Sequence, residues 1–209
     1  VDECVVAPGT YHETINFLGK AITLRSSGGA DVTTIDATGI GGSVVTCATG
    51  EGPDTVLVGF TITGGTGPYV PSINRYAGGG MYNFYSSPTV SNCTFNNNYV
   101  RSPTPPYYHT IGGGMCNLYS NPTVTHCTFT GNTSTGPESF GGGGMCNENS
   151  SPTVTHCTFS GNSAYSGGGM YNNLGSPMVT NCTFIGNTAI RGGGGIHNFN
   201  SNPTVTNCT

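Results

Sequence analysis

Residues 78–83 read Gly-Gly-Gly-Met-Tyr-Asn, and residues 87–98 read Ser-Pro-Thr-Val-Ser-Asn-Cys-Thr-Phe-Asn-Asn-Asn. This pattern returns four more times along the chain. The last Gly of each run precedes its Cys by 13 residues, whereas the interval from that Cys to the next such Gly is 21, 17, 12 or 13 residues. A constant half and a variable half are typical of a solenoid, whose insertions leave as loops on one side.

The length and composition of the repeat favour strands. The shortest complete period, from Gly144 to Gly169, is 25 residues. A helix-pair repeat needs roughly 34 residues and a propeller blade about 40, so this period suits one turn of a parallel β-coil. Thr, Val, Phe and Tyr favour strands, while Pro and Gly bound them.

A corner must interrupt the constant half of each coil. Val90 and Phe95 are five residues apart, and a straight strand would place them on opposite faces. We therefore expect a corner at Asn92, because Asn tolerates the left-handed backbone that such a corner needs. The predicted interior ladders are Val90/Val124/Val154/Val179/Val205, Cys93/Cys127/Cys157/Cys182/Cys208, Phe95/Phe129/Phe159/Phe184 and Met81/Met115/Met145/Met170/Ile196, and the corner ladder is Asn92/His126/His156/Asn181/Asn207.

The repeat resembles a known family. The pairing of Gly-Gly-x-Met with Phe-x-x-Asn, as in Phe95–Asn98 and Phe129–Asn132, resembles the repeats of bacterial polymorphic outer-membrane proteins. More broadly it resembles the right-handed parallel β-helices of secreted surface proteins and of the pectate-lyase-like fold superfamily. The resemblance implies an all-β fold, a right-handed parallel β-helix of about seven coils. It does not decide function, because β-helices carry lyases, hydrolases, adhesins and stalks alike.

We expect one domain over residues 1–209. Residues 1–77 are interpreted as irregular N-terminal coils, the first over 1–24 and the second over 31–65, and residues 78–209 hold the five repeats. The chain starts at Val1 without a signal peptide, and we interpret it as a mature or trimmed product.

Charge excludes some partners. Charged residues make up 7% of the chain, against about 25% in ordinary domains. The net charge of −4 leaves no basic surface for nucleic acid. No apolar run approaches the roughly 20 residues that span a membrane. Few charges and many Thr and Asn residues favour an extracellular or cell-surface location.

The nine cysteines include one candidate disulfide. Most follow the repeat and are interpreted as small buried apolar residues. Cys116 and Cys146 instead stand where other coils have Tyr or His. Their Cα atoms should lie about 4.8 Å apart, which is inside the disulfide range, and the alternative is two free thiols. Cys4 and Cys47 form a second, weaker candidate pair.

The acidic residues do not suggest a catalytic cluster. Seven of the nine acids precede residue 60, and only Glu138 and Glu148 fall in the repeats. Asp36 and Glu51 belong to the best acidic group, which we interpret as turn and cap chemistry. We therefore expect a non-enzymatic protein without a cofactor, with a polysaccharide lyase or hydrolase as the less favoured alternative. His126 and His156 are interpreted as substitutes for Asn in the corner ladder, with a shared metal as the alternative.

The variable halves, 99–111 and 133–140 above all, should cluster on one edge of the solenoid. This edge could bind glycans or host and surface proteins, or its aromatic residues could simply cover the solenoid. The candidate ligand-binding residues are Arg101, Tyr107, Tyr108, His109, Phe140 and Tyr165. Asn132 and Asn149 are candidate glycosylation sites, because the sequon residues of the corner ladder should be buried.

Two functions besides the less favoured polysaccharide enzyme follow from these patterns. The chain ends inside a repeat, so a following coil could come from a longer array or from another subunit that extends a head-to-tail filament. We expect a structural β-solenoid that forms a filament or a surface stalk, and the alternative is an adhesin or carbohydrate-binding module. The outward threonines also resemble the flat arrays of ice-binding β-solenoids, but outward Thr is common on any parallel sheet.

Overall fold

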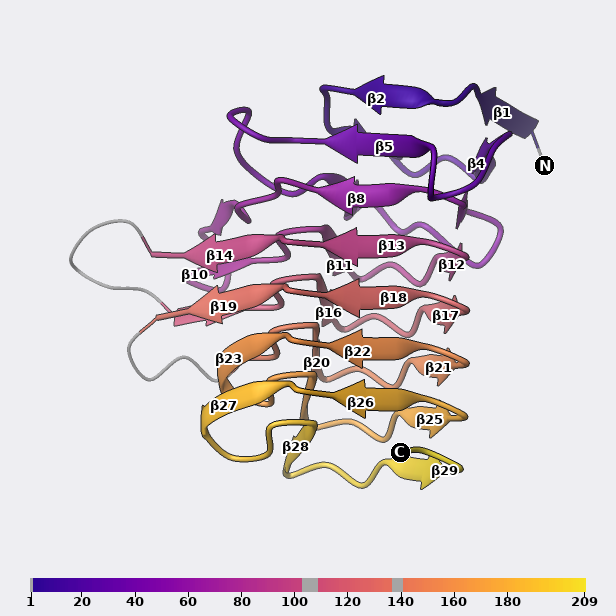
Figure 1. The fold of residues 1–209 in the computed structure, drawn as a ribbon. Helices are drawn as coiled ribbons and strands as arrows, with labels where there is room; N and C mark the ends of the chain where they lie inside the picture. Colours follow the sequence, from indigo (N-terminus) through magenta and orange to yellow (C-terminus); the bar gives the residue numbers. More distant parts are fainter. Residues whose placement is uncertain (1, 103–108, 137–140) are drawn as a thin grey trace.

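The computed structural model describes residues 2–102, 109–136 and 141–209. In these residues the chain forms strands, turns and bends, which wind around one axis into a stack of coils (Figure 1). The expected all-β parallel β-helix is therefore confirmed. None of the described segments is an apolar helix of membrane-spanning length.

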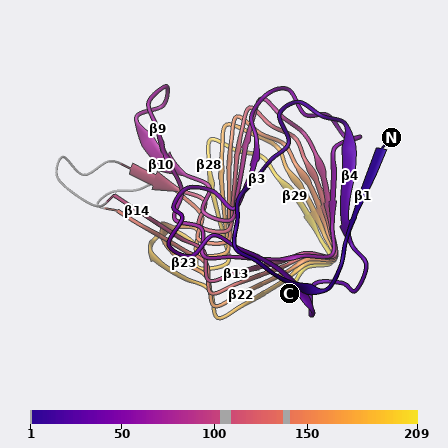
Figure 2. The same cartoon turned by 90° about the horizontal axis from the view of Figure 1, so that it is seen from above.

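Three parallel sheets form the walls of the solenoid (Figure 2). The first wall consists of β1 (Asp2–Val6), β4 (Ile22–Ser26), β7 (Val56–Val58), β12 (Thr89–Ser91), β17 (Thr123–Thr125), β21 (Thr153–Thr155), β25 (Met178–Thr180) and β29 (Thr204–Thr206). The second wall consists of β2 (Gly9–Tyr11), β5 (Thr33–Asp36), β8 (Thr61–Thr63), β13 (Thr94–Asn96), β18 (Thr128–Thr130), β22 (Thr158–Ser160) and β26 (Thr183–Ile185). The third wall consists of β3 (Ile15–Asn16), β6 (Val45–Cys47), β11 (Met81–Phe84), β16 (Met115–Leu118), β20 (Met145–Glu148), β24 (Met170–Asn173) and β28 (Ile196–Phe199).

The walls give seven coils and the first strand of an eighth, as expected. The predicted extent of the second coil, residues 31–65, was wrong. Strand β4 already pairs with β1, with Asp2 opposite Ile22, and β7 pairs with β4, with Leu24 opposite Leu57. The second coil therefore begins near Ile22, and β7 begins a third.

The predicted interior ladders are confirmed. Val90, Cys93, Phe95 and Met81 are at most 1% exposed, and their equivalents in the next two coils are buried as well. The phenyl rings of adjacent coils stack with centroid distances of 4.7 to 4.8 Å and nearly parallel planes. Each coil thus buries apolar surface mainly against the coils above and below it.

The left-handed backbone of the corner is confirmed, but the expectation that its side chains are buried was wrong. Asn92 has a φ of 52° and His126 one of 53°, and the other three corner residues have similar left-handed values. All five side chains are exposed, because the corner turns them away from the core. The rings of His126 and His156 stack at 4.9 Å on this outer surface.

Two ladders of asparagines, buried except in the last coils, hold the coils together instead. One ladder contains Asn98, Asn132, Asn162 and Asn187, and the other contains Asn83, Asn117, Asn147, Asn172 and Asn198. In the first ladder each amide also donates to a backbone carbonyl, as Asn132 Nδ2 does to Phe95 O at 2.8 Å. Since buried polar groups need partners, the first ladder satisfies backbone groups where the coil turns, and the second pairs its amides with one another.

Two smaller sheets lie on one side of the solenoid (Figures 1 and 2). The side sheet contains β14 (Tyr99–Arg101), β19 (Thr133–Thr135), β23 (Ser163–Ser166) and β27 (Thr188–Arg191). The flap sheet contains β9 (Tyr69–Val70), β10 (Arg75–Ala77) and β15 (His109–Ile111). The described parts of the variable halves do cluster on one edge, as predicted, but much of them forms strands where loops were expected.

Candidate ligand-binding surface

The side sheet presents one face to solvent. Val100, Ser134 and Ala164 point inward and are at most 4% exposed. Because side chains alternate along a strand, the residues between them point outward. The outward face carries Tyr99, Arg101, Thr133, Thr135, Ser163, Tyr165, Thr188 and Ile190.

Two hollows flank this face. One hollow, of about 250 Å³, lies at the β14 edge of the sheet and is lined by Tyr76, Tyr99 and Arg101 together with Thr66 and Gly67. The other hollow, of about 260 Å³, lies across β19 and β23, and its lining residues are Ser134, Thr135, Gly136, Ser163, Ala164, Tyr165 and Ile190. The face therefore offers aromatic rings and hydroxyl groups beside two concave spaces.

A hydrogen bond joins the two hollows. Thr135 Oγ1 donates to the hydroxyl oxygen of Tyr99 at 2.9 Å, so the Tyr99 ring is oriented by the next coil. Arg101 lies directly opposite Thr135 in the sheet and is exposed. Among the described residues no carboxylate forms an ion pair with Arg101, whereas Arg25 and Arg75 pair with Glu3 and Glu148.

The structure brings together only part of the predicted loop-edge set. Arg101 and Tyr165 share the outward face of the side sheet. His109 instead belongs to the flap sheet, where it lies opposite Arg75. Tyr107, Tyr108 and Phe140 lie outside the described residues. Sequence reasoning missed Tyr99 and Thr135, although the alternation of their segments with buried Val100 and Ser134 was a usable signal.

A second apolar cluster lies between the flap sheet and the third wall. It is formed by Ala77, Tyr82, Ile111, Cys116, Leu118, Cys146 and Tyr171. An ion pair between Arg75 in β10 and Glu148 in β20 fastens the flap to the third wall. Burial raises the pKa of the Tyr171 hydroxyl to about 12, so the phenol stays neutral. The flap is thus a packed part of the fold.

The predicted disulfide between Cys116 and Cys146 is not present. Both residues lie opposite each other in β16 and β20, as expected, but both are free thiols with no exposed surface. Burial raises the pKa of the Cys116 thiol well above its usual value, so the reactive thiolate is disfavoured. Cys4 and Cys47 are free as well, with Cys4 exposed and Cys47 buried.

The acidic residues of the early coils have structural partners. Glu51 is 2% exposed and accepts hydrogen bonds from the backbone of Gly19 and Thr49 and from the hydroxyls of Thr49 and Ser86. Burial raises the pKa of Glu51, but these hydrogen bonds outweigh it and lower the pKa to about 2. Asp36 accepts a hydrogen bond from Thr38 N at 2.8 Å.

We predict that Glu51→Gln lowers the free energy of unfolding by about 2 kcal/mol at pH 7, because the amide NH₂ would face the backbone N–H of Gly19 or of Thr49, which can only donate. The folded pKa lies below the ordinary value of 4.5, so the carboxylate stabilises the fold above pH 4.5 and loses this effect as the pH falls towards 2. Urea unfolding at pH 7 and pH 3 should show the difference between the two proteins shrinking at low pH. Asp54→Asn, at an exposed turn, is the matched control.

The two stacked histidines do not converge on a shared ligand. Their rings are 4.9 Å apart with an angle of 3° between planes, so equivalent nitrogens lie side by side and do not point at a common atom. His156 Nε2 is 3.1 Å from Asn181 Nδ2 and so continues the corner ladder. In the part of the chain that the structure describes, no group of three or more His, Cys, Asp or Glu residues is arranged to hold a metal ion.

Of the two predicted glycosylation sites, the one at Asn132 was a wrong prediction. Its side chain is fully buried in the asparagine ladder and cannot meet a modifying enzyme in the folded protein. Asn149 is half-buried with a φ of 49°, and it stays a prediction. The exposed sequons are instead those of Asn92, Asn181 and Asn207 at the outer corner.

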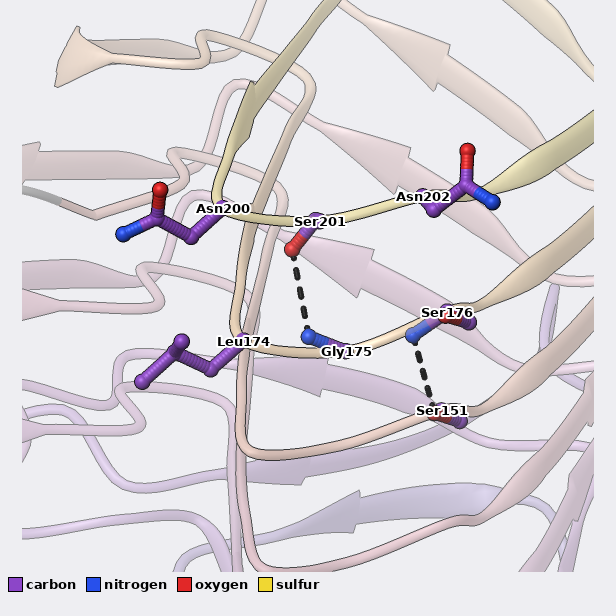
Figure 3. A pocket seen from close by; sticks show the side chains of 7 residues that line it. All are labelled: Ser151, Leu174, Gly175, Ser176, Asn200, Ser201 and Asn202. Atoms are coloured by element: carbon purple, nitrogen blue, oxygen red, sulfur yellow. Dashed lines mark hydrogen bonds between the residues drawn. The ribbon is translucent and has the colours of Figure 1, made fainter.

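A shallow depression lies where the third wall turns into the first in the last coils (Figure 3). Ser201 Oγ accepts a hydrogen bond from Gly175 N at 3.2 Å, and Ser151 Oγ accepts one from Ser176 N at 2.9 Å. These groups join successive coils, as Ser120 and Ser150 do earlier. Because the hydroxyls serve coil stacking, we assign no ligand to this depression.

Comparison with known families agrees with the geometry. The family model for the right-handed β-helix region matches residues 13–209. The chain belongs to the right-handed β-helix family. Membership of this family indicates that the coils are right-handed, as expected, and it agrees with the seven in-register coils described above. Neither the curated proteins nor the solved structures gave a match.

Proposed function

We propose that this right-handed β-helix is a non-enzymatic, extracellular structural protein that serves as a surface stalk or as the subunit of a filament. The observation that carries this proposal is the continuity of its ladders. Phe, Cys, Val and Asn columns run in register from coil to coil, and each Asn hydrogen-bonds the next. Each coil is therefore held by the same contacts to the coils above and below it along the whole axis, as a mechanically strong shaft requires.

The carboxylates also support a non-enzymatic role. A glycosidase or lyase needs acidic groups that face a substrate groove. Here Glu51 is buried in a turn, and Glu3 and Glu148 pair with arginines. Release of reducing ends from a panel of acidic polysaccharides would contradict this part of the proposal.

The filament form of the proposal rests on the equivalence of the coils. Successive repeats present the same ladder residues at the same register, so a coil of one copy is complementary to a coil of another. Parallel strand pairing and apolar stacking would then continue across the junction, and a head-to-tail contact of this kind propagates.

Negative-stain electron microscopy of the full natural polypeptide tests the shaft. Filaments in which the subunits join end to end would support self-assembly. Isolated straight rods would support the stalk form. Compact particles with no long axis would contradict both forms.

The proposed location is extracellular or at the cell surface, because charged residues are 7% of the chain and Thr and Asn dominate its outer positions. Protease treatment of intact source cells should remove the protein if this is right. Survival of the protein in intact cells, with cleavage only after lysis, would contradict it.

A second candidate function, a binding module, is favoured by the side sheet. Its two hollows, its paired Tyr99 and Thr135, and the exposed Arg101 make a surface that coil stacking does not use. The two functions are compatible, since a stalk can carry a binding surface on its flank. Glycans or surface proteins are the partners that this candidate implies.

A further inference from the structure

We infer that the outward face of the side sheet binds an oligosaccharide that is uncharged except for one carboxylated sugar. This inference rests on the second candidate function above and names its ligand class. The face combines three kinds of groups that sugars use: hydroxyls in rows, tyrosine rings and a guanidinium. The hydroxyls belong to Thr133, Thr135, Ser163 and Thr188, the rings to Tyr99 and Tyr165, and the guanidinium to Arg101.

The size of the face favours a small ligand over a protein. Four strands cover about 14 Å along the axis, and the two outward positions of each strand lie about 7 Å apart across it. The resulting area is on the order of 100 Å², whereas a stable protein interface needs about 800 Å² from each partner. A short oligosaccharide matches this footprint.

The charge of the face favours a single acidic group. Among the described residues, Arg101 is the one arginine on the outward face of the side sheet. Arg191 belongs to the same sheet, but it lies opposite the inward-pointing Ser166. The chain carries a net charge of −4, so a polyanion would be repelled as a whole. One carboxylate on an otherwise neutral glycan gains the charge-assisted, bidentate contact without this repulsion.

The positions of the groups define how such a ligand lies. Arg101, Thr135 and Tyr165 follow one another across three adjacent strands. A carboxylate on Arg101 therefore places the adjoining sugar ring over Thr135 and the next ring against Tyr165. Tyr99 and Tyr165 are two strands apart, about 10 Å along the axis, so they bracket the ligand. The hydrogen bond from Thr135 to Tyr99 fixes the tyrosine ring before the ligand binds. This lowers the entropy cost of ordering that side chain on binding.

Isothermal titration calorimetry of the full chain with sialyllactose and with lactose tests the inference. These probes differ by the carboxylated sugar. We expect sialyllactose to bind about tenfold more tightly than lactose, as one charge-assisted pair implies. Arg101→Gln should bring the two affinities to within about twofold of each other, and Tyr165→Ala should weaken both.

The matched control is Arg191→Gln, which removes a guanidinium of the same sheet from the opposite side and should change neither affinity. Thermal unfolding of each variant verifies that it is folded. Equal affinity for sialyllactose and lactose would overturn the acidic class but leave a binding module. Tighter binding of oligogalacturonate than of sialyllactose would overturn the single-charge argument. Binding of none of the three probes would overturn both the inference and glycan binding by this face, while the shaft is tested separately by microscopy.

Discussion

Asn132→Ala is expected to lower the free energy of unfolding by about 4 kcal/mol. The Asn132 amide accepts from Asn98 N at 3.1 Å and donates to Phe95 O at 2.8 Å, and it also pairs with the amides of Asn98 and Asn162. Alanine leaves the buried Asn98 N–H without a partner and removes the side-chain donor from Phe95 O, which still belongs to the strand ladder. An unpaired buried N–H costs about 1–3 kcal/mol, and the hydrogen bonds to Phe95 O and to the two neighbouring ladder amides are lost as well.

Chemical denaturation monitored by far-UV circular dichroism measures this effect. Asn96→Ala is the matched control, because Asn96 points outward from the adjacent strand and is half-exposed. We expect its effect to stay within about 0.5 kcal/mol, which is usual for surface substitutions. If the two variants unfold at the same denaturant concentration, the asparagine ladder does not stabilise the coils.

Gly114→Ala is expected to destabilise the protein by about 3 kcal/mol, because it forces two coils apart. A Cβ at this position would lie 2.5 Å from Gly144 O and 3.0 Å from Phe129 Cδ1. That carbonyl cannot move freely, since Met115 N donates to it at 2.9 Å. Overpacking of this kind costs about 1–3 kcal/mol, and here a ladder hydrogen bond is strained as well.

The control for this prediction is Gly52→Ala. A Cβ at Gly52 meets nothing within 4 Å, and its backbone is outside the left-handed region. Alanine there should be neutral or stabilising by up to about 1 kcal/mol, because it restricts the unfolded chain. Thermal and urea unfolding of both variants compares them. A Gly114→Ala protein as stable as Gly52→Ala would show that the glycine run does not serve close approach between coils.

Much of the fold could be predicted because its determinants are local and repeated. The interval of 13 residues, the alternation around Val90 and the left-handed preference of Asn92 placed the walls, the corner and the interior ladders. The early coils repeat less regularly, so their boundaries were misplaced. The candidate site was predicted only in outline: Arg101 and Tyr165 were found, but the side sheet that joins them to Tyr99 was not.

The remaining differences arise from residues whose role depends on what packs against them. Asn92 and Asn132 are both asparagines of a sequon, yet one is exposed and the other fully buried. Cys116 and Cys146 lie opposite each other as predicted, yet they remain thiols in an apolar cluster that the flap sheet completes. Spacing gives the register of such residues, but it does not say which elements cover them.

By itself the sequence determined that this chain is a β-helix, how many coils it has and which residues fill its core. These properties follow from periodicity, because each coil contacts only its neighbours and repeats the same local choices. Only the tertiary structure decided which polar residues are buried in ladders, how the flap closes over the third wall and which side chains share the outward face of the side sheet. Those outcomes depend on contacts between the variable halves of different coils, whose lengths differ and whose positions no repeat specifies.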